Sequence, residues 1–167
     1  MEITMIYGSD GGNTEDIATQ IADKLDATVK SIDVSKATAD DFTQAQNLIL
    51  GTSTWGEGDL QSDWEDFIDE LDSIDFSGKK VALFGLGDQD GYGDSFVGAM
   101  SLLYEKVKEK GATIVGGGVS TDGYDFEESE AVIDGTFVGL PIDEDNQSDL
   151  TEERIDNWTT QIQKEFA

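Results

Sequence analysis

Short apolar runs alternate with helical patterns along the whole chain. Runs of the length of buried strands lie at 3–7, 28–32, 45–50, 81–86 and 112–115. After the first run, Ile17, Ile21 and Leu25 recur at the four-residue spacing of one helix face. Three further helical faces are predicted from Trp64, Phe67, Ile68 and Leu71, from Phe96, Met100, Leu103 and Val107, and from Ile155, Trp158, Ile162 and Phe166.

Three segments between these patterns carry their own expectations. Residues 35–42 have the character of a polar connection. The polar, glycine-containing stretch 116–135 separates the fifth run from the apolar residues 137–140, which predicts one strand split by an insertion. Thr151 is expected to cap the last helix, with Leu150 and Ile155 placed as a hydrophobic staple.

Strands that alternate with helices predict an α/β fold, with a doubly wound parallel sheet in three layers and a single domain over residues 1–167. In such sheets ligands bind beyond the carboxyl ends of the strands, where the strand order reverses. Glycine-rich loops follow the first, third and fourth runs, at 8–15, 51–59 and 87–93. We therefore expect these three loops to meet at one binding edge.

The first loop has the composition of a phosphate site. Its glycines allow close approach of the backbone, its hydroxyls and N–H groups can donate, and the following helix N-terminus favours an anion. It has no Walker lysine after Gly12, and its glycines are spaced wrongly for the dinucleotide fingerprint. Such a set of neutral donors suits a phosphate monoester held as an anchor; the alternative is an ordinary capped turn.

The other two loops each carry one aromatic residue flanked by glycines, Trp55 and Tyr92. Neither belongs to a helical face, whereas Trp64 and Trp158 do and are assigned to the core. Two aromatic rings on facing loops can clamp a flat ring. Together with the phosphate loop they indicate a planar ligand with a phosphate tail, unless each ring only covers its own loop.

Composition narrows the possible partners and chemistry. The 167 residues carry 37 acidic and 10 basic side chains, a net charge of −27, which disfavours nucleic acid and favours basic protein surfaces; adaptation to salt is the alternative explanation. The absence of cysteine and histidine disfavours hydrolase, transferase and thiolate-metal chemistry. With no long apolar run and no signal peptide, a cytoplasmic protein without a membrane contact is expected.

The loop motifs resemble those of the flavodoxin family. The resemblance rests on Gly8-Ser9-Asp10-Gly11-Gly12-Asn13-Thr14-Glu15, on Thr54-Trp55 through Trp64, on Gly87-Asp88-Gln89-Asp90-Gly91-Tyr92 and on residues 137–147. It covers essentially the whole chain, and the interrupted fifth strand is similar to that of long-chain members. It implies a five-stranded sheet of order 2-1-3-4-5 that binds flavin mononucleotide (FMN) without a covalent bond.

The resemblance also implies roles for particular residues. The phosphate would be wrapped by Ser9, Asp10, Gly11, Gly12, Asn13 and Thr14. Thr54 and Asp143 would lie near the ribityl chain, Trp55 and Tyr92 on the two ring faces, Gly87 and Asp88 at the pyrimidine edge, and Gly56, Gly58 and Ser95 around the ring. Gly11 departs from the family, which usually has threonine there, so one hydroxyl donor to the phosphate is lost.

The implied function is low-potential, one-electron transfer between the semiquinone and hydroquinone states, with no catalytic residue and no metal. We expect the Gly56–Glu57 peptide to flip on one-electron reduction. The acid-rich segments 59–63 and 88–94 would dock a monomeric carrier onto basic faces of redox enzymes, such as a ferredoxin/flavodoxin-NADP reductase. Alternatives on related folds are an NAD(P)H-dependent quinone or flavin reductase and a signalling receiver domain; the latter lacks its acidic residues after the first strand, where Gly8 and Ser9 stand.

Overall fold

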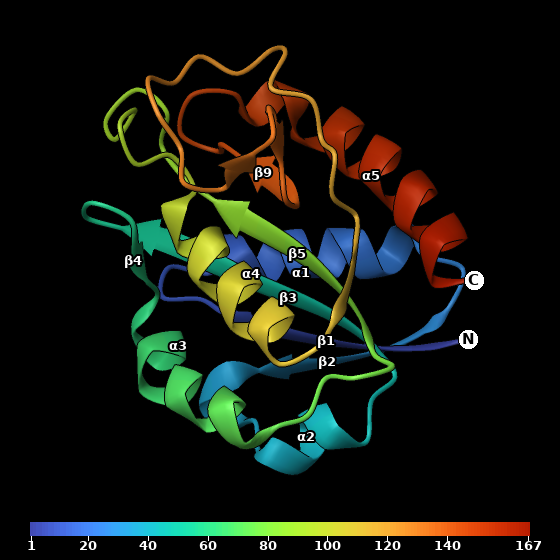
Figure 1. The fold of residues 1–167 in the computed structure, drawn as a ribbon. Coiled ribbons are helices and arrows are strands. Elements are labelled where there is room, and N and C mark those ends of the chain that lie inside the picture. Colours follow the sequence, from blue (N-terminus) through green and yellow to red (C-terminus); the bar gives the residue numbers. More distant parts are fainter.

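A parallel sheet forms the centre of the computed structural model, which describes all residues from 1 to 167 (Figure 1). Its strands, in spatial order, are β2 (Thr28–Asp33), β1 (Glu2–Gly8), β3 (Asn47–Trp55), β5 (Lys80–Leu86) and β6 (Thr113–Val115). Every pair along this path is parallel. Counted along the chain these are strands 2-1-3-4-5, so the predicted order is confirmed, and the order reverses between β1 and β3.

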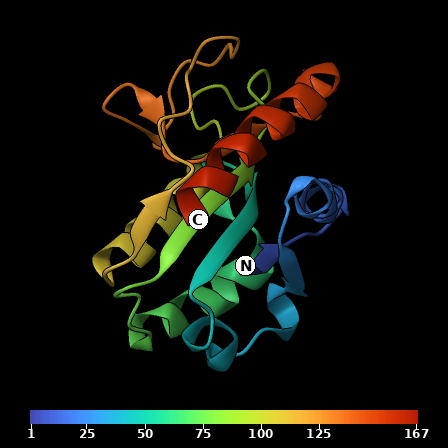
Figure 2. The same cartoon turned by 90° about the vertical axis from the view of Figure 1, so that its right-hand side faces the viewer.

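Helices cover both faces of the sheet and complete three layers. On one face lie α1 (Asn13–Lys24) and α5 (Thr151–Phe166), over an apolar cluster of 18 buried residues. On the other lie α2 (Ala39–Thr43), α3 (Ser62–Phe67) and α4 (Gly98–Glu109), over a cluster of 23 buried residues. Figures 1 and 2 show α1 and α4 on opposite sides of the sheet. None of the helices combines the length and the apolar character needed to cross a membrane.

The predicted apolar faces are buried almost throughout. The residues named for the α4 and α5 faces are all buried, as are Trp64, Phe67 and Leu71, whereas Ile68 is only half-buried. Ile68 lies where α3 gives way to a 3-10 helix (Ile68–Ser73), so the single long helix expected there is wrong in detail. A 3-10 helix has three residues per turn instead of 3.6, so the α-helical spacing used for the prediction does not continue through Ile68–Ser73.

Two local expectations are corrected. The connection at 35–42 contains a 3-10 helix (Val34–Lys36) and α2, which is fixed by the buried Phe42 and by the Asp41 carboxylate accepting from the Thr38 N–H at 2.8 Å. A five-residue helix shows no repeated apolar spacing, so its pattern is not recognisable. Thr151 is the first helical residue of α5 and does not cap it; the preceding position is Leu150, at the end of a 3-10 helix (Ser148–Leu150).

The third strand is longer than its apolar run. β3 continues to Trp55 and pairs antiparallel with β4 (Asp59–Leu60). Thr54 and Trp55 therefore lie on a strand, and the loop between the two strands is only the turn 56–58. Gly56 and Gly58 in this turn have φ of 51° and 100°, a conformation that side chains rarely adopt.

The insertion also ends later than expected. Residues 136–137 form β8 (Thr136–Phe137), which pairs with β7 (Val132–Ile133), and the sheet resumes only at β9 (Leu140–Ile142) beside β5. Gly139 lies between β8 and β9. It must be glycine because a Cβ there would lie 2.1 Å from the Leu83 carbonyl oxygen. The insertion folds over the loop after β5, where the N–H groups of Glu127 and Glu128 donate to the Gly93 carbonyl.

Candidate functional site

A cavity of about 330 Å³ opens at the carboxyl ends of β1, β3 and β5, where the strand order reverses. Segments from all three predicted loops line it, together with residues that follow β9. Its fifteen lining residues are Ser9, Asp10, Gly11, Asn13, Thr14, Ser53, Thr54, Trp55, Gly56, Leu86, Gly87, Asp88, Tyr92, Glu144 and Asp145. The expectation that the three glycine-rich loops meet at one edge is therefore confirmed.

The loop between β1 and α1 presents hydrogen-bond donors to one end of this cavity. Gly12, with φ of 90°, precedes α1, and its N–H donates to the Ser9 Oγ at 3.0 Å. No side chain caps α1. Because the first N–H groups of a helix have no partner within it, they are available to an anion, and the helix dipole favours negative charge at this position. The geometry is that of an anion site built from neutral donors.

Gln61 fixes the position of the loop between β1 and α1 by a hydrogen bond to Asp10. Its side chain is fully buried, and its amide donates to the Asp10 carboxylate at 2.9 Å while its Oε1 accepts from the Trp64 N–H at 3.2 Å. Gly8 must be glycine, because a Cβ there would lie 2.1 Å from the Gln61 Oε1. Gln61 thereby joins the phosphate-type loop to the start of α3.

Trp55 and Tyr92 are large aromatic residues that remain exposed, at 51% and 48%. Both line the cavity, and their role in covering a flat ring stays a prediction. The Trp55 indole N–H donates to the Ser53 Oγ at 3.0 Å, which holds the ring on the end of β3. Exposed aromatic rings of this kind offer apolar faces on which a planar ligand can stack.

Asp143 connects the loop after β5 with the loop after β9 at the other end of the cavity. Its fully buried carboxylate accepts from the N–H groups of Gln89, Asp145 and Asn146 at 3.0–3.1 Å and from the Asn146 side-chain amide. The same amide donates to Asp88 at 2.7 Å. Asp143 therefore holds the loop after β5 against the loop after β9, and its side chain lies beneath the cavity lining.

The carboxylates of Asp88, Asp143 and Asp145 lie within 4.8 Å of one another. Hydrogen bonds from the Gly91 N–H and the Asn146 amide lower the pKa of Asp88, whereas burial, followed by the charges of Asp88 and Asp143, raises the pKa of Asp145. The hydrogen bonds stabilise the negative charge of Asp88, whereas partial loss of solvent and the two neighbouring carboxylates oppose the negative charge of Asp145. The result is a negative potential at this end of the cavity.

Four predicted residues are not part of the lining: Gly12, Gly58, Ser95 and Asp143. Gly12 and Asp143 are hydrogen-bonded to residues of the lining: the Gly12 N–H donates to the Ser9 Oγ, and the Asp143 carboxylate accepts from the Asp145 N–H. Sequence reasoning did not single out Ser53, Leu86, Glu144 and Asp145 as site residues. Ser53 and Leu86 lie at the ends of the predicted strands, so their adjacency to the loops was a usable signal. Glu144 and Asp145 follow β9, whose start the insertion obscured.

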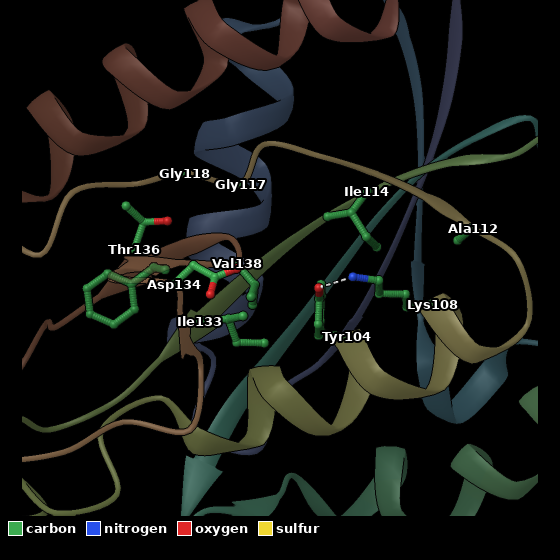
Figure 3. Close-up of a pocket in the computed structure, with 11 residues that line it drawn as sticks. Tyr104, Lys108, Ala112, Ile114, Gly117, Gly118, Ile133, Asp134, Thr136 and Val138 are labelled. Carbon is green, nitrogen blue, oxygen red and sulfur yellow. Dashed lines mark hydrogen bonds between the residues drawn. The ribbon is translucent and has the colours of Figure 1, made fainter.

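A second hollow, of about 420 Å³, lies between α4 and the hairpin of β7 and β8 (Figure 3). In it the Lys108 ammonium donates to the Tyr104 hydroxyl at 2.8 Å. Its lining includes Ala112, which directly precedes β6, and Ile114 of β6. It contains none of the predicted site residues. We therefore assign the functional site to the smaller cavity at the carboxyl ends of the strands.

The fold and the site together define a flavodoxin-like α/β domain whose switch point accommodates an anion and a flat ring. Comparison with known proteins agrees: the family model described as Flavodoxin matches residues 5–158. A flavodoxin from Synechocystis is 52% identical over 163 residues, covering 96% of this chain and 95% of the relative, and one from Helicobacter pylori is 47% identical over 99% of both. The chain belongs to the flavodoxin family.

Solved structures show the same relation. The crystal structure of Fusobacterium nucleatum flavodoxin bound to flavin mononucleotide matches with a TM-score of 0.95 and 38% identity, covering 99% of both chains. The fold is therefore shared with a protein that holds the flavin nucleotide.

Proposed function

We propose that the whole chain acts as one FMN-binding domain and as a one-electron carrier between redox enzymes. The observation that carries the proposal is the cavity that unites a neutral anion loop with two exposed aromatic rings at the switch point of the sheet. Membership in the flavodoxin family and the FMN-bound structural relative support it.

The residues present fit the phosphate and the ring of FMN. Ser9, Thr14 and the free N–H groups at the start of α1 would hold the phosphate, and Trp55 and Tyr92 would cover the ring. Thr54 also lines the cavity and would contact the ribityl chain. Gly87 and Asp88 line the cavity and would lie at the pyrimidine edge.

Bound FMN supplies the one-electron chemistry, and the protein sets how readily each electron is accepted. All four charged residues of the lining are acidic: Asp10, Asp88, Glu144 and Asp145. Negative charge close to a partly buried ring opposes the addition of further negative charge. We therefore infer a low potential for the second electron.

The turn 56–58 has the backbone freedom that a redox-linked flip requires. Gly56 lines the cavity and already has φ of 51°. The proposed reorientation of the Gly56–Glu57 peptide would present its carbonyl group to the ring. A β-branched residue at position 56 would resist this conformation, because side chains rarely adopt positive φ.

The mouth of the cavity carries exposed acids suited to a basic partner. Glu57, Asp59, Asp90, Asp94 and Asp145 are exposed, whereas Leu60 and Gln61, within the segment proposed for docking, are buried. Opposite charge would steer a reductase of the ferredoxin/flavodoxin-NADP type or another redox enzyme to this face, in complexes that weaken with salt. The cytoplasmic location and the monomeric state expected from the sequence stay predictions.

An NAD(P)H-dependent reductase is the second candidate on this fold. The cavity lining contains no lysine or arginine, which a nicotinamide nucleotide phosphate would need close to the ring. This observation favours the carrier.

The visible spectrum during anaerobic, stepwise reduction of the FMN-loaded protein tests the proposal. We expect a yellow protein that accumulates a blue one-electron-reduced form before it bleaches. Bleaching in one two-electron step, or rapid bleaching by NAD(P)H alone, would support the reductase. Failure of the apoprotein to take up FMN would refute both.

A further inference from the structure

The start of α4 touches two of the site loops at once. Val97 and Gly98 form this contact, which we call the α4 step. A Cβ added to Gly98 would lie 3.2 Å from the Cα of Gly58, in the turn that follows Trp55. A Cβ added to Gly87 would lie 2.9 Å from the Val97 nitrogen and 3.0 Å from its Cγ1. The step therefore lies between the turn 56–58 and the loop after β5.

The contact between Gly58 and Gly98 is made by backbone atoms, and the Ser95 Cβ lies equally near a Cβ added at Gly58, at 3.8 Å. Gly58 and Gly98 face each other without side chains, and a Cβ at Gly58 would meet the Gly98 Cα at 3.8 Å. A rotating side chain cannot relieve added volume here, because the neighbouring atoms belong to the main chain. Any enlargement at position 98 must displace the turn or the helix.

The conformation of Val97 directs the step toward the turn. This fully buried, β-branched residue has φ of 46° and ψ of 28°, in the left-handed region that such residues avoid. After this bend the Ala99 N–H donates to the Thr54 Oγ1 at 3.4 Å. A strained residue that persists in a packed core indicates that its surroundings determine the local geometry.

We propose that the α4 step is a positioning element for the turn 56–58, with Gly98 as the residue on which the turn rests. Gly98 does not line the cavity; it acts through Gly58 on a turn that includes Gly56, which does. The inference deepens the proposed function, because it assigns control of the redox-linked turn to a residue outside the site. Gly87 is glycine, on this account, to admit the step, whereas Gly58 is glycine because of its φ of 100°.

The Gly98→Ala variant tests the proposal. Alanine suits a helix better than glycine, so α4 itself should not be weakened. The added methyl group should press on Gly58, and we expect the formation constant of the one-electron-reduced flavin to fall on the order of five- to tenfold. The dissociation constant of oxidised FMN from the apoprotein, measured by fluorescence quenching, should rise by a smaller factor.

Gly117→Ala is the matched control. Gly117 has no positive φ, lies away from the cavity, and its added Cβ would meet the Val138 carbonyl oxygen at an ordinary 3.4 Å. Circular dichroism and urea unfolding of each apoprotein establish that both variants fold. Equal effects of the two substitutions on the one-electron-reduced form, or no effect of Gly98→Ala beyond twofold, would overturn the inference.

A measurement on the unmodified protein covers the case in which Gly98→Ala does not fold. The hydrogen-exchange rate of the Ala99 amide should differ by at least about fivefold between the oxidised and fully reduced FMN-loaded protein, because its acceptor, the Thr54 hydroxyl, lies on the strand that leads into the reorienting turn. An unchanged rate would overturn the inference. If the unmodified protein never accumulates a one-electron-reduced form, the proposed function itself fails, which separates the two results.

Discussion

Restoring a hydroxyl at position 11 is the sharpest test of how this chain holds a phosphate. The structure places Gly11 in the cavity lining, exposed, with no atom within 4 Å of the position of an added Cβ. Its φ is not in the positive region, so a side chain causes no backbone strain there. Threonine therefore fits without displacing the loop.

The expected gain follows from one new hydrogen bond to a charged group. Such a bond contributes roughly 1.5–3 kcal/mol, and fixing the side chain costs roughly 0.5–1 kcal/mol. The net gain of roughly 1–2 kcal/mol corresponds to FMN binding about 5- to 30-fold tighter in Gly11→Thr. Fluorescence titration of the apoprotein with FMN at constant ionic strength measures it.

Gly11→Val separates the hydroxyl from the rest of the side chain. Valine has the same branched shape and restricts the unfolded chain similarly, but it has no donor. We expect Gly11→Val to bind FMN no more tightly than the unmodified protein. If the valine and threonine variants bind within twofold of each other, the reasoning about a missing phosphate donor is wrong.

Three further predictions concern stability. Gly139→Ala should destabilise the fold by about 1–3 kcal/mol in urea unfolding, since its Cβ would strike the Leu83 carbonyl oxygen in β5; Gly117→Ala, with ordinary contacts, should change stability far less. The lowered pKa of Asp88 implies stability that is complete above pH about 4, the unfolded value, and is lost as the pH falls through the lower folded value. Asp88→Asn should flatten that acid limb, and an unchanged limb would contradict the assignment. The net charge of −27 over 7773 Å² of surface gives a mean charge spacing of about 17 Å, within the Debye length of about 30 Å at 0.01 M salt but beyond that of about 8 Å at 0.15 M. The urea midpoint should therefore rise with KCl over this range at pH 7 and respond much less near pH 4, close to the isoelectric point of about 4.1, where the net charge is small; equal responses would exclude charge repulsion as the cause.

The strands of the sheet could be predicted from local patterns, whereas their order was predicted from the resemblance to the flavodoxin family. The apolar runs gave β1, β2, β3 and β5 to within a few residues at their starts, and buried helical faces followed from regular spacing. Errors arose where tertiary contacts decide. The extension of β3 to Trp55 depends on pairing with β4, and the late start of β9 depends on β8 folding back onto β7. Neither pairing has a signal in a short, polar, glycine-rich stretch.

The site was predicted at the level of loops and less well at the level of individual residues. Trp55, Tyr92 and most of the phosphate-type loop line the cavity, because exposed aromatic residues and small donors are recognisable by type. Gln61 was not recognised, although its buried side chain joins Asp10 to the start of α3. A glutamine three residues before Trp64 reads as one polar position among several, and only the packing shows what it supports.

The glycines of the site illustrate why residue type and residue role separate. Gly56, Gly58 and Gly87 all occur in glycine-rich loops and were all expected to contact the cofactor. The structure gives them different reasons for being glycine. Gly56 and Gly58 need positive φ, whereas Gly87 lines the cavity and yields space to Val97. A motif that records only the glycines merges conformational need, close packing and ligand contact, and these respond differently to substitution.

Alanine at Gly87 would meet the backbone nitrogen of Val97 at 2.9 Å, so its effect on flavin binding would pass through α4 as well as through the ring edge. Loss of function at such a position therefore identifies a contact with the cofactor only when the helix behind it is shown to be unmoved.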